Sequence, residues 1–574
     1  MLPDNLTTDT VHLLAGGEVE RRYGPPGTGK STSLKQTIGE LVADRGPDSV
    51  IVTSFTVTAA KSLADMGLSL PDRQVGTLHS LAYRAIGTPD VALKPKILRE
   101  WNARVGFGWR ITPDARQGHP DTADSGGGGG DGDELLAAYD MARSRLVPAG
   151  EMPAEVRRFA VAWDEWKRSV NAIDFTDMIS LALERALDGE RAPGNPQVLI
   201  SDEAQDMTPL ETALVLAWGG LAGETILALD DDQAINAWRG GDPAPILALG
   251  SGEGVNVVDR VLDQSYRIPS SVHAVSQSWI EACTARRLKP YRPRDVAGQI
   301  YAVSHPIEAM PTAEAIARDA HAGRSVLVLA ACEYMLRQLI TNLKKIGVPF
   351  GNHYRPAETR WNPLSSAVGM TPAHRLFRFL VMDEASLGGW SDQGGRAHLW
   401  TGDDVRAWLE LVAVKEAGLV RGAKTVAKHL PSGELDIAQV EGLFASDEAL
   451  VRATVPELGW LLECARGLKG MTEKLTYPAA VAKAHGPAAL VDRPKVVVGT
   501  IHSAKGAEAE VVYLSPSVSG AGHQEWLRGG RARDNARRQF YVGLTRAERT
   551  CVVLGSSERS VPRAALIPPE LWVR

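Results

Sequence analysis

A glycine-rich turn that ends in a lysine and a hydroxyl is the first stretch of this chain with recognisable chemistry. Residues 24–31 read Gly-Pro-Pro-Gly-Thr-Gly-Lys-Ser and fit the phosphate-loop pattern G-x-x-x-x-G-K-[ST] at every fixed position. In such a loop, backbone N–H groups and a helix N-terminus face a polyphosphate, Lys30 reaches the outer phosphates, and the Ser31 hydroxyl binds Mg²⁺. A turn with a chance lysine is the weaker alternative, because every fixed position is satisfied. The predicted nucleotide-binding residues of the loop are Gly24, Pro25, Pro26, Gly27, Thr28, Gly29, Lys30, Ser31 and Thr32.

Two carboxylates and a glutamine follow apolar stretches further along the chain. Asp202 and Glu203 come after Val198-Leu199-Ile200-Ser201, at the end of an expected strand. Beside a phosphate loop, Asp202 would hold Mg²⁺ directly or through water, and Glu203 would polarise the attacking water. Gln233 could sense the γ-phosphate or orient that water, because an amide both donates and accepts hydrogen bonds. An acidic turn without chemistry is the alternative, and the phosphate loop in the same core argues against it.

Two arginines could supply the positive charge that phosphoryl transfer needs. Arg267 lies near the middle of the chain and Arg546 near its end. Arginine stabilises the charge that develops as the γ-phosphate leaves. If that arginine comes from the opposite domain, hydrolysis depends on domain closure. Ordinary surface salt bridges are the alternative for either arginine.

One tryptophan and three polar turns could contact a nucleic acid. Trp238 offers either a flat face for base stacking or an ordinary core side chain, and both hypotheses stay open. Thr500–Glu508 is a small, polar, glycine-containing turn after an expected strand, which suits it to gripping the phosphates of a strand. Similar polar turns occur at Thr53–Thr56 and Gly76–Ser80, and each of these signals is weak alone.

Short β-branched runs supply the strands that would position these residues. They indicate buried parallel strands in two groups, before and after about residue 265, so we expect an α/β protein with two cores. The stretch Glu18–Tyr23, just before the phosphate loop, is too charged for a central strand. The expected strands contain Val50–Thr53, Val198–Ile200, Ile226–Leu229, Val326–Leu329, Val496–Val498, Val511–Leu514 and Cys551–Leu554.

Two mainly helical segments interrupt the expected sheets. In the first of them, Ala154–Val170 and Asp174–Leu187 are the clearest helices, and a glycine-rich loop at 126–133 is expected to have no role. The predicted domains are a first core at 1–94 and 196–268 with an insertion at 95–195, and a second core at 269–354 and 493–574 with an insertion at 355–492.

Composition limits the class of protein. A chain of 574 residues is too long for one core, and a net charge of −6 neither indicates nor excludes nucleic acid, because a basic groove can lie on an acidic body. The four cysteines lack C-x-x-C spacing, which argues against zinc or iron–sulfur sites and for a reducing compartment. With no secretory start and no apolar run of membrane-spanning length, a soluble cytoplasmic protein is expected.

Together and in this order, these stretches resemble the motifs of the UvrD/Rep family of superfamily 1 DNA helicases. The phosphate loop resembles motif I, and residues 174–178 resemble a family segment that precedes motif II. The other matches are Thr53–Thr56 to motif Ia, Gly76–His79 to motif Ib, Asp202–Asp206 to motif II, Asp230–Gly240 to motif III, Gln264–Arg267 to motif IV, Thr500–Glu508 to motif V and Gln539–Ala547 to motif VI.

The resemblance implies two RecA-like cores with ATP and Mg²⁺ between them and single-stranded DNA across their top. It implies a translocase that moves 3′→5′ and unwinds duplex DNA at junctions, in repair, replication or recombination. Tyr266 would stack near the adenine and Glu508 would lie near the ribose. The implied hydrolysis residues are Lys30, Ser31, Asp202, Glu203, Gln233, Arg267 and Arg546, and the implied DNA contacts are Phe55, Thr56, Thr77, His79, Trp238 and His502.

The chain also departs from the family pattern. No glutamine precedes the phosphate loop, the first being Gln36, so the adenine-reading Q motif is not visible and the choice of nucleotide stays open. Residues 355–492 match the family's second insertion poorly. A translocase that displaces proteins or senses DNA ends with little unwinding is the alternative within the class, and a nucleotide-gated DNA-binding regulator is a more distant one. Protein partners are not predicted, and a monomer is the working expectation.

Overall fold

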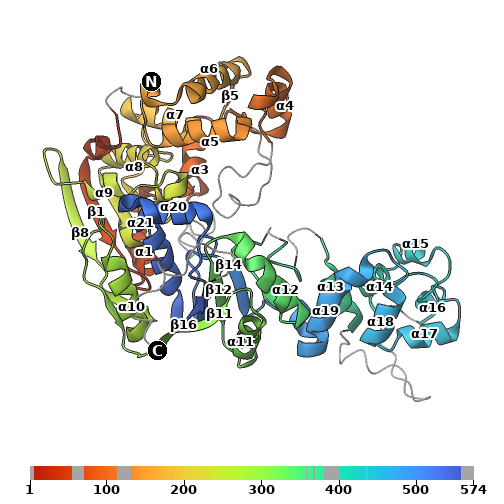
Figure 1. The fold of residues 1–574 in the computed structure, drawn as a ribbon. Coiled ribbons are helices and arrows are strands. Elements are labelled where there is room, and N and C mark those ends of the chain that lie inside the picture. Colours follow the sequence, from red (N-terminus) through yellow and green to blue (C-terminus); the bar gives the residue numbers. More distant parts are fainter. Residues whose placement is uncertain are drawn as a thin grey trace. The chain divides into compact units, whose positions relative to one another are not determined.

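The computed structural model describes residues 6–54, 70–112, 131–356, 359–365, 369–380, 400–433, 435 and 437–556. Contacts divide the described chain into two units. The first unit takes the residues up to 300 and 518–550, and the second takes 301–517 and 551–556. Each unit contains its own sheet with helices around it, so the predicted α/β fold with two cores is confirmed (Figure 1).

The sheet of the first unit brings three strand ends together. Its described strands follow the order β3-β2-β6-β7-β1-β8, and every neighbouring pair is parallel. The carboxyl ends of β1, β6 and β7 therefore meet at one edge, where the loops that begin near residues 24, 202 and 230 emerge. The strands are β1 (Gly17–Tyr23), β2 (Val50–Thr53), β3 (Val75–Gly76), β6 (Val198–Ser201), β7 (Glu224–Leu229) and β8 (Val255–Val261).

Strand β1 corrects one expectation from the sequence. The stretch that looked too charged for a central strand is paired on both sides, by β7 and β8. Buried Arg21 binds Asp259 at 2.7 Å and donates to three backbone carbonyls. Buried Arg22 binds Glu20 and donates to the side chains of Ser33 and Thr37 in α1. Charged side chains are tolerated here because each guanidinium finds acceptors inside the unit.

The first insertion forms a helical layer with its own apolar core. Trp101 packs against Trp163 with a ring separation of 5.0 Å, and both rings are buried. The two helices predicted most clearly are confirmed as α6 and α7. The helices of the first unit are α1 (Lys30–Arg45), α3 (Leu78–Ala85), α4 (Pro95–Arg104), α5 (Asp131–Ser144), α6 (Ala154–Ser169), α7 (Phe175–Leu187), α8 (Pro209–Ala222), α9 (Ala244–Leu247), α10 (Ser270–Glu281), α20 (Gly520–Arg528) and α21 (Gly530–Leu544).

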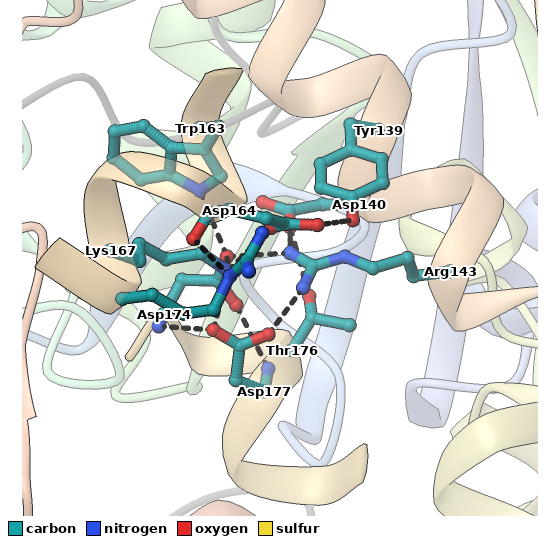
Figure 2. Close-up of polar contacts among 10 residues, drawn as sticks. Tyr139, Asp140, Arg143, Trp163, Asp164, Lys167, Asp174, Thr176 and Asp177 are labelled. Carbon is teal, nitrogen blue, oxygen red and sulfur yellow. Dashed lines mark hydrogen bonds and ion pairs between the residues drawn. The ribbon is translucent and has the colours of Figure 1, made fainter. Parts of the chain in front are cut away.

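A cluster of buried charges joins α5, α6 and α7 at the start of α7 (Figure 2). Asp174 is the N-cap of α7 and accepts hydrogen bonds from Arg143 and Lys167, both at 2.7 Å. Asp177 completes the capping box and contacts the same two cations at 2.6 and 2.5 Å. Arg143 also binds Asp140 at 2.6 Å. We call these five residues, Asp140, Arg143, Lys167, Asp174 and Asp177, the insertion cluster.

The second unit repeats the parallel arrangement around β12. Strands β14 and β15 flank β12 in parallel, and β13 adds to β14. The order is β11-β16-β15-β12-β14-β13. The strands are β11 (Gln299–Pro306), β12 (Val326–Ala330), β13 (Phe350–Gly351), β14 (Val496–Thr500), β15 (Ala509–Leu514) and β16 (Ala547–Gly555).

The second insertion is helical, as expected, and its helices α14–α18 gather away from the strands of this unit, beyond α13 and α19 (Figure 1). Trp400 and Trp460 pack around Trp408, and all three rings are buried. The helices of the unit are α11 (Met310–His321), α12 (Arg337–Lys345), α13 (Pro372–Leu380), α14 (Gly402–Leu409), α15 (Ala423–Ala427), α16 (Ile437–Glu441), α17 (Asp447–Ala453), α18 (Leu458–Ala465) and α19 (Met471–His485).

The domain limits given from the sequence stay a prediction. The sequence analysis assigns all of 493–574 to the second core, whereas contacts group 518–550, which includes α20 and α21, with the first unit. The glycine-rich loop at 126–133 lies mostly outside the described residues. Among the described residues, no helix is long and apolar enough to cross a membrane.

Candidate active site

The phosphate loop follows β1 and is shaped by glycines in the left-handed region. Gly27 and Gly29 have φ values of 73° and 77°, which glycine adopts without strain. A Cβ at Gly24 would lie 2.8 Å from the Cβ of Lys30, so the loop passes directly over that side chain. Lys30 begins α1 and is buried. The local sequence therefore folds as the motif predicts, with backbone turned around the head of a helix.

Lys30 lies between the two predicted acidic residues. Its Nζ atom is 2.8 Å from Glu203 and 3.9 Å from Asp202. Burial opposes the charge on Lys30, but the two carboxylates outweigh it and raise the pKa of the ammonium group. The lysine is therefore cationic at any physiological pH. Its position at the head of α1 is that of a group that binds phosphate.

The oxygen atoms near Lys30 suit a hard cation. Asp202 is buried after β6, and the Ser31 hydroxyl is exposed at the first turn of α1. Carboxylate and hydroxyl oxygens are ligands that Mg²⁺ accepts when phosphate oxygens and water complete its shell. Ser31 and Asp202 therefore fit the predicted metal, although their roles stay a prediction.

Glu203 is held in an unusual backbone conformation. Its φ of 56° lies in the left-handed region, which costs a non-glycine residue free energy. Gln205 donates to Glu203 Oε2 at 2.6 Å, and its own Oε1 accepts the N–H of Asp230 at 3.0 Å. Sequence reasoning missed Gln205, although it lies inside the motif that named Glu203. Its amide links the end of β6 to the end of β7.

Gln233 and Arg546 are in direct contact. Gln233 donates from Nε2 to Asp230 Oδ2 at 2.7 Å and accepts from Arg546 Nη2 at 2.9 Å. Both side chains are buried. Arg546 follows α21, and contacts within the chain group both with the first unit. Gln233 and Arg546 therefore meet inside one unit. The sequence analysis instead placed Arg546 on the opposite core.

Strand β9 (Gln264–Pro269) brings Arg267 and Tyr266 to the phosphate loop. The N–H of Tyr266 donates to Gly27 at 2.8 Å, and Ser265 Oγ donates to Pro26 at 3.0 Å. A Cβ at Gly27 would lie 2.4 Å from the Cβ of Arg267. The Tyr266 ring is 71% exposed, which leaves its face open. The structure thus places both predicted residues beside the loop.

A small pocket adjoins Asp202 and Glu203 and also carries two predicted DNA contacts, Thr77 and His79. Its volume is about 40 Å³, which is too small for a ligand cavity. Thr77 is the N-cap of α3, and burial lowers the pKa of the His79 imidazole, which favours its neutral form. The lining residues are Thr53, Ser54, Thr77, Leu78, His79, Ser201, Asp202, Glu203, Met207, Glu211 and Arg239.

Glu211 connects His79 with Arg239, two residues that line this pocket, and was not predicted from the sequence. Its carboxylate binds Arg239 at 2.8 and 2.9 Å and lies 3.7 Å from His79 Nδ1. The capping box with Thr208 at the start of α8 fixes its position. Trp238, next to Arg239, is half-buried and donates to Asn236 at 3.3 Å. The two predicted contacts Phe55 and Thr56 lie outside the described residues.

His502 and Glu508 belong to the second unit, in the turn that follows β14. Ser503 caps this turn, because its N–H donates to Thr500 Oγ1 at 3.1 Å and its hydroxyl donates to the Thr500 carbonyl at 2.9 Å. His502 is half-buried and Glu508 is exposed. The turn is compact and polar, as its sequence predicts, and its proposed ligand contacts stay untested.

Two known protein-family models match this chain. The model described as an AAA domain matches residues 16–239, which carry the phosphate loop, Glu203 and Gln233. The model of the UvrD-like helicase C-terminal domain matches residues 478–556, which carry the Thr500–Glu508 turn and Arg546. A search of curated proteins found no significant match. The matched domains support a DNA helicase or ATPase in general, and the chain belongs to the UvrD/Rep-like helicase family.

Proposed function

We propose that this chain is an ATP-dependent DNA helicase that moves 3′→5′ on single-stranded DNA and unwinds duplex DNA at junctions. The observation that supports this best is the continuous series of contacts from Lys30 through Glu203, Gln205, Asp230 and Gln233 to Arg546. It joins phosphate binding, water activation and charge stabilisation in one network. The direction and a task in repair, replication or recombination come from the family resemblance, whereas the cytoplasmic setting is the expectation from the composition.

Each residue of the site has one task in this proposal. Bound ATP supplies the phosphoryl group, and bound Mg²⁺ neutralises charge on the phosphates. Lys30 and the loop N–H groups hold the phosphates, while Ser31 and Asp202 hold the metal. Glu203 takes a proton from the attacking water, and Gln205 keeps that carboxylate in place. Gln233, Arg267 and Arg546 stabilise the charge that develops on the leaving oxygens.

The small pocket offers a route between DNA and hydrolysis. Thr77 and His79 line it together with Asp202 and Glu203. A strand that presses on the first pair shifts the surroundings of the second pair, because packed side chains transmit displacement. We therefore expect single-stranded DNA to stimulate ATP hydrolysis.

Unwinding of duplexes with a 3′ or a 5′ single-stranded tail, each with ATP and with GTP, tests the proposal. Unwinding of the 3′-tailed duplex alone supports 3′→5′ movement, and equal rates with GTP reflect the missing Q motif. Preference for the 5′ tail would overturn the direction. Translocation without strand separation would favour the protein-displacing alternative.

Trp238→Ala tests the predicted base platform. Loss of a stacking face costs about 1–3 kcal/mol per base, so movement slows while nucleotide binding and basal hydrolysis persist. The control is Trp109→Ala, because Trp109 is also half-buried but lies in the insertion. Stopped-flow translocation along fluorescent oligonucleotides measures the effect. Unchanged translocation in Trp238→Ala would show that Trp238 serves in packing and not in base stacking.

A further inference from the structure

Lys289 is a buried cation that no motif explains. It lies between α10 and β10 (Arg292–Arg294), and its side chain is 2% exposed. Its Nζ atom lies 3.0 Å from Asp230, 2.7 Å from Asp231 and 2.8 Å from Asp232. The ammonium group therefore contacts all three carboxylates that follow β7. Burying a lysine in this way costs free energy unless nearby carboxylates compensate its charge.

The three aspartates do not share their other partners equally. Arg286 binds Asp232 at 2.8 and 2.7 Å, and the N–H of Arg287 donates to Asp231 at 2.8 Å. For Asp230, Lys289 is the cation in contact among the described residues. Burial, together with the charges of Asp232 and Asp231, raises the pKa of Asp230, and the contact with the Lys289 ammonium group is the main effect that opposes this rise. Asp230 thus depends on Lys289 to stay ionised.

The charge of Asp230 decides how the amide of Gln233 is turned. An ionised Asp230 only accepts hydrogen bonds, so it takes the Nε2 donor of Gln233 at 2.7 Å. The amide oxygen then faces Arg546 Nη2 at 2.9 Å. A protonated Asp230 can donate to that oxygen instead, which turns the NH₂ group toward the guanidinium. Two donors would then face each other and the contact would be lost.

We propose that Lys289 is a positioning residue for Gln233. By pairing with Asp230, it holds the Gln233 amide with its oxygen toward Arg546. This inference rests on the proposed hydrolysis site and adds a residue that contacts neither nucleotide nor DNA in that site. Because Lys30 and the loop backbone bind the phosphates, Lys289 acts on the hydrolysis step rather than on nucleotide affinity.

Steady-state ATP hydrolysis in the presence of single-stranded DNA tests this inference. It is measured for the wild type, Lys289→Met and Lys289→Arg. We expect Lys289→Met to lower kcat by about 10²-fold with KM for ATP within about twofold, because a transition-state contact is lost. Lys289→Arg keeps the charge and restores part of kcat. The matched control is Arg287→Met on the same segment, whose guanidinium pairs with Asp259 instead. It should hydrolyse ATP at the wild-type rate. A normal kcat in Lys289→Met, or an equal loss of kcat in Lys289→Met and Lys289→Arg, would overturn the proposal.

A double-mutant cycle separates positioning from general damage. In a Gln233→Ala background, Lys289→Met should add less than about a twofold loss, since its target is gone. Additive losses would contradict the inference. If Lys289→Met folds poorly, Asp230→Asn serves instead, because it removes the carboxylate charge that Lys289 is proposed to maintain and keeps the shape of the side chain.

Binding of ADP with aluminium fluoride, beside ADP alone, gives a readout without turnover. Lys289→Met should weaken the aluminium fluoride complex about 10-fold or more and leave ADP binding unchanged, because aluminium fluoride imitates the transferring group. Equal binding by the variant and the wild type would overturn the inference. A wild type whose hydrolysis does not respond to DNA would instead count against the proposed function and leave this comparison intact.

Discussion

The first unit contains two largely buried groups of charges that are built from the same kinds of side chain but differ in their surroundings. The insertion cluster pairs Arg143 and Lys167 with Asp174 and its neighbours, and these charges satisfy one another at the cap of α7 (Figure 2). At the phosphate loop, Lys30 pairs with Glu203, whose side chain is 26% exposed and whose backbone is strained. In the insertion cluster, Asp140 and Asp177 are 21% and 22% exposed, but the charges are paired with one another across three helices, whereas the second group lines a small pocket.

This difference separates a structural use of charge from a chemical one. In the insertion cluster, cations join three helices, and Asp174 also accepts the Trp163 N–H at 3.0 Å. At the phosphate loop, Glu203 contacts Gln205 and Lys30, and part of its side chain is exposed to solvent. A carboxylate that must meet water needs that opening and that fixed direction. Strain held at such a residue is typical of functional sites.

The largest expected effect breaks the loop group. Lys30→Ala and Glu203→Gln should each lower DNA-stimulated ATP hydrolysis by about 10³-fold or more, because phosphate binding or water activation is lost. Phosphate release with saturating single-stranded DNA measures the loss. Lys94→Ala is the control, since Lys94 is half-exposed and pairs with Asp90 just before the insertion. Hydrolysis at the wild-type rate in either site variant would refute the assignment of the site.

Breaking the insertion cluster should instead lower stability. Asp174→Ala leaves Arg143 and Lys167 with less negative charge to compensate theirs, and it removes the cap of α7. We therefore expect a loss of about 3–5 kcal/mol in the free energy of unfolding. Urea unfolding followed by circular dichroism measures it. Asp90→Ala, at an exposed pair, should change stability by less than about 0.5 kcal/mol. Asp174→Ala with wild-type stability would show that the cluster contributes little.

The pH dependence of the insertion cluster sharpens the comparison. Burial and the charge of Asp174 raise the pKa of Asp140 to about 6, despite Arg143. Since the folded pKa exceeds the unfolded one, the folded state binds the extra proton between about pH 4 and 6, and stability falls as pH rises through 6. Groups that face Asp140 include Asp174, Arg143 and Thr176. Asp140→Asn should remove a decrease of about 1–2 kcal/mol between pH 5 and 7. Identical profiles in both proteins would contradict this.

The smallest expected effect isolates the strain at Glu203. Both Glu203→Gly and Glu203→Ala remove the carboxylate, so both should be inactive, but only glycine relaxes the positive φ. Glu203→Gly should therefore be more stable than Glu203→Ala by about 1 kcal/mol. Thermal unfolding of the two variants measures the difference. Equal stabilities would show that the surrounding contacts, rather than strain, set the conformation.

Part of the site could be predicted from local sequence because its residues lie in short motifs. Asp202, Glu203 and Gln233 follow apolar runs that form β6 and β7, the phosphate loop is fixed by its own pattern, and parallel strands bring these ends to one edge. The sequence also indicates Trp238 as a candidate base platform and residues 174–178 as a segment that resembles one in the family. Asp174 proved to be a helix cap within a charge cluster.

Residues that act through distant partners were missed. Lys289 lies in no motif, and the motif that contains Gln205 gives it no partner; the contacts of both residues with Asp230 join separate parts of the chain. The run of three aspartates at 230–232 lies in a stretch matched to motif III, but the sequence does not show which cation pairs with it. The same reason explains β1, whose Arg21 binds Asp259 far along the chain. A charged strand looks implausible until its partners are known.

The sequence by itself determined the phosphate loop, the α/β alternation, the two helical insertions and the family motifs, because these depend on spacing and periodicity within short segments. Only the tertiary structure decided that Arg546 meets Gln233 within the first unit, that Glu211 links His79 with Arg239, and that Lys289 closes on three carboxylates. Such pairings depend on which strand ends and loops meet after folding, and the cost of burying an unpaired charge then selects them.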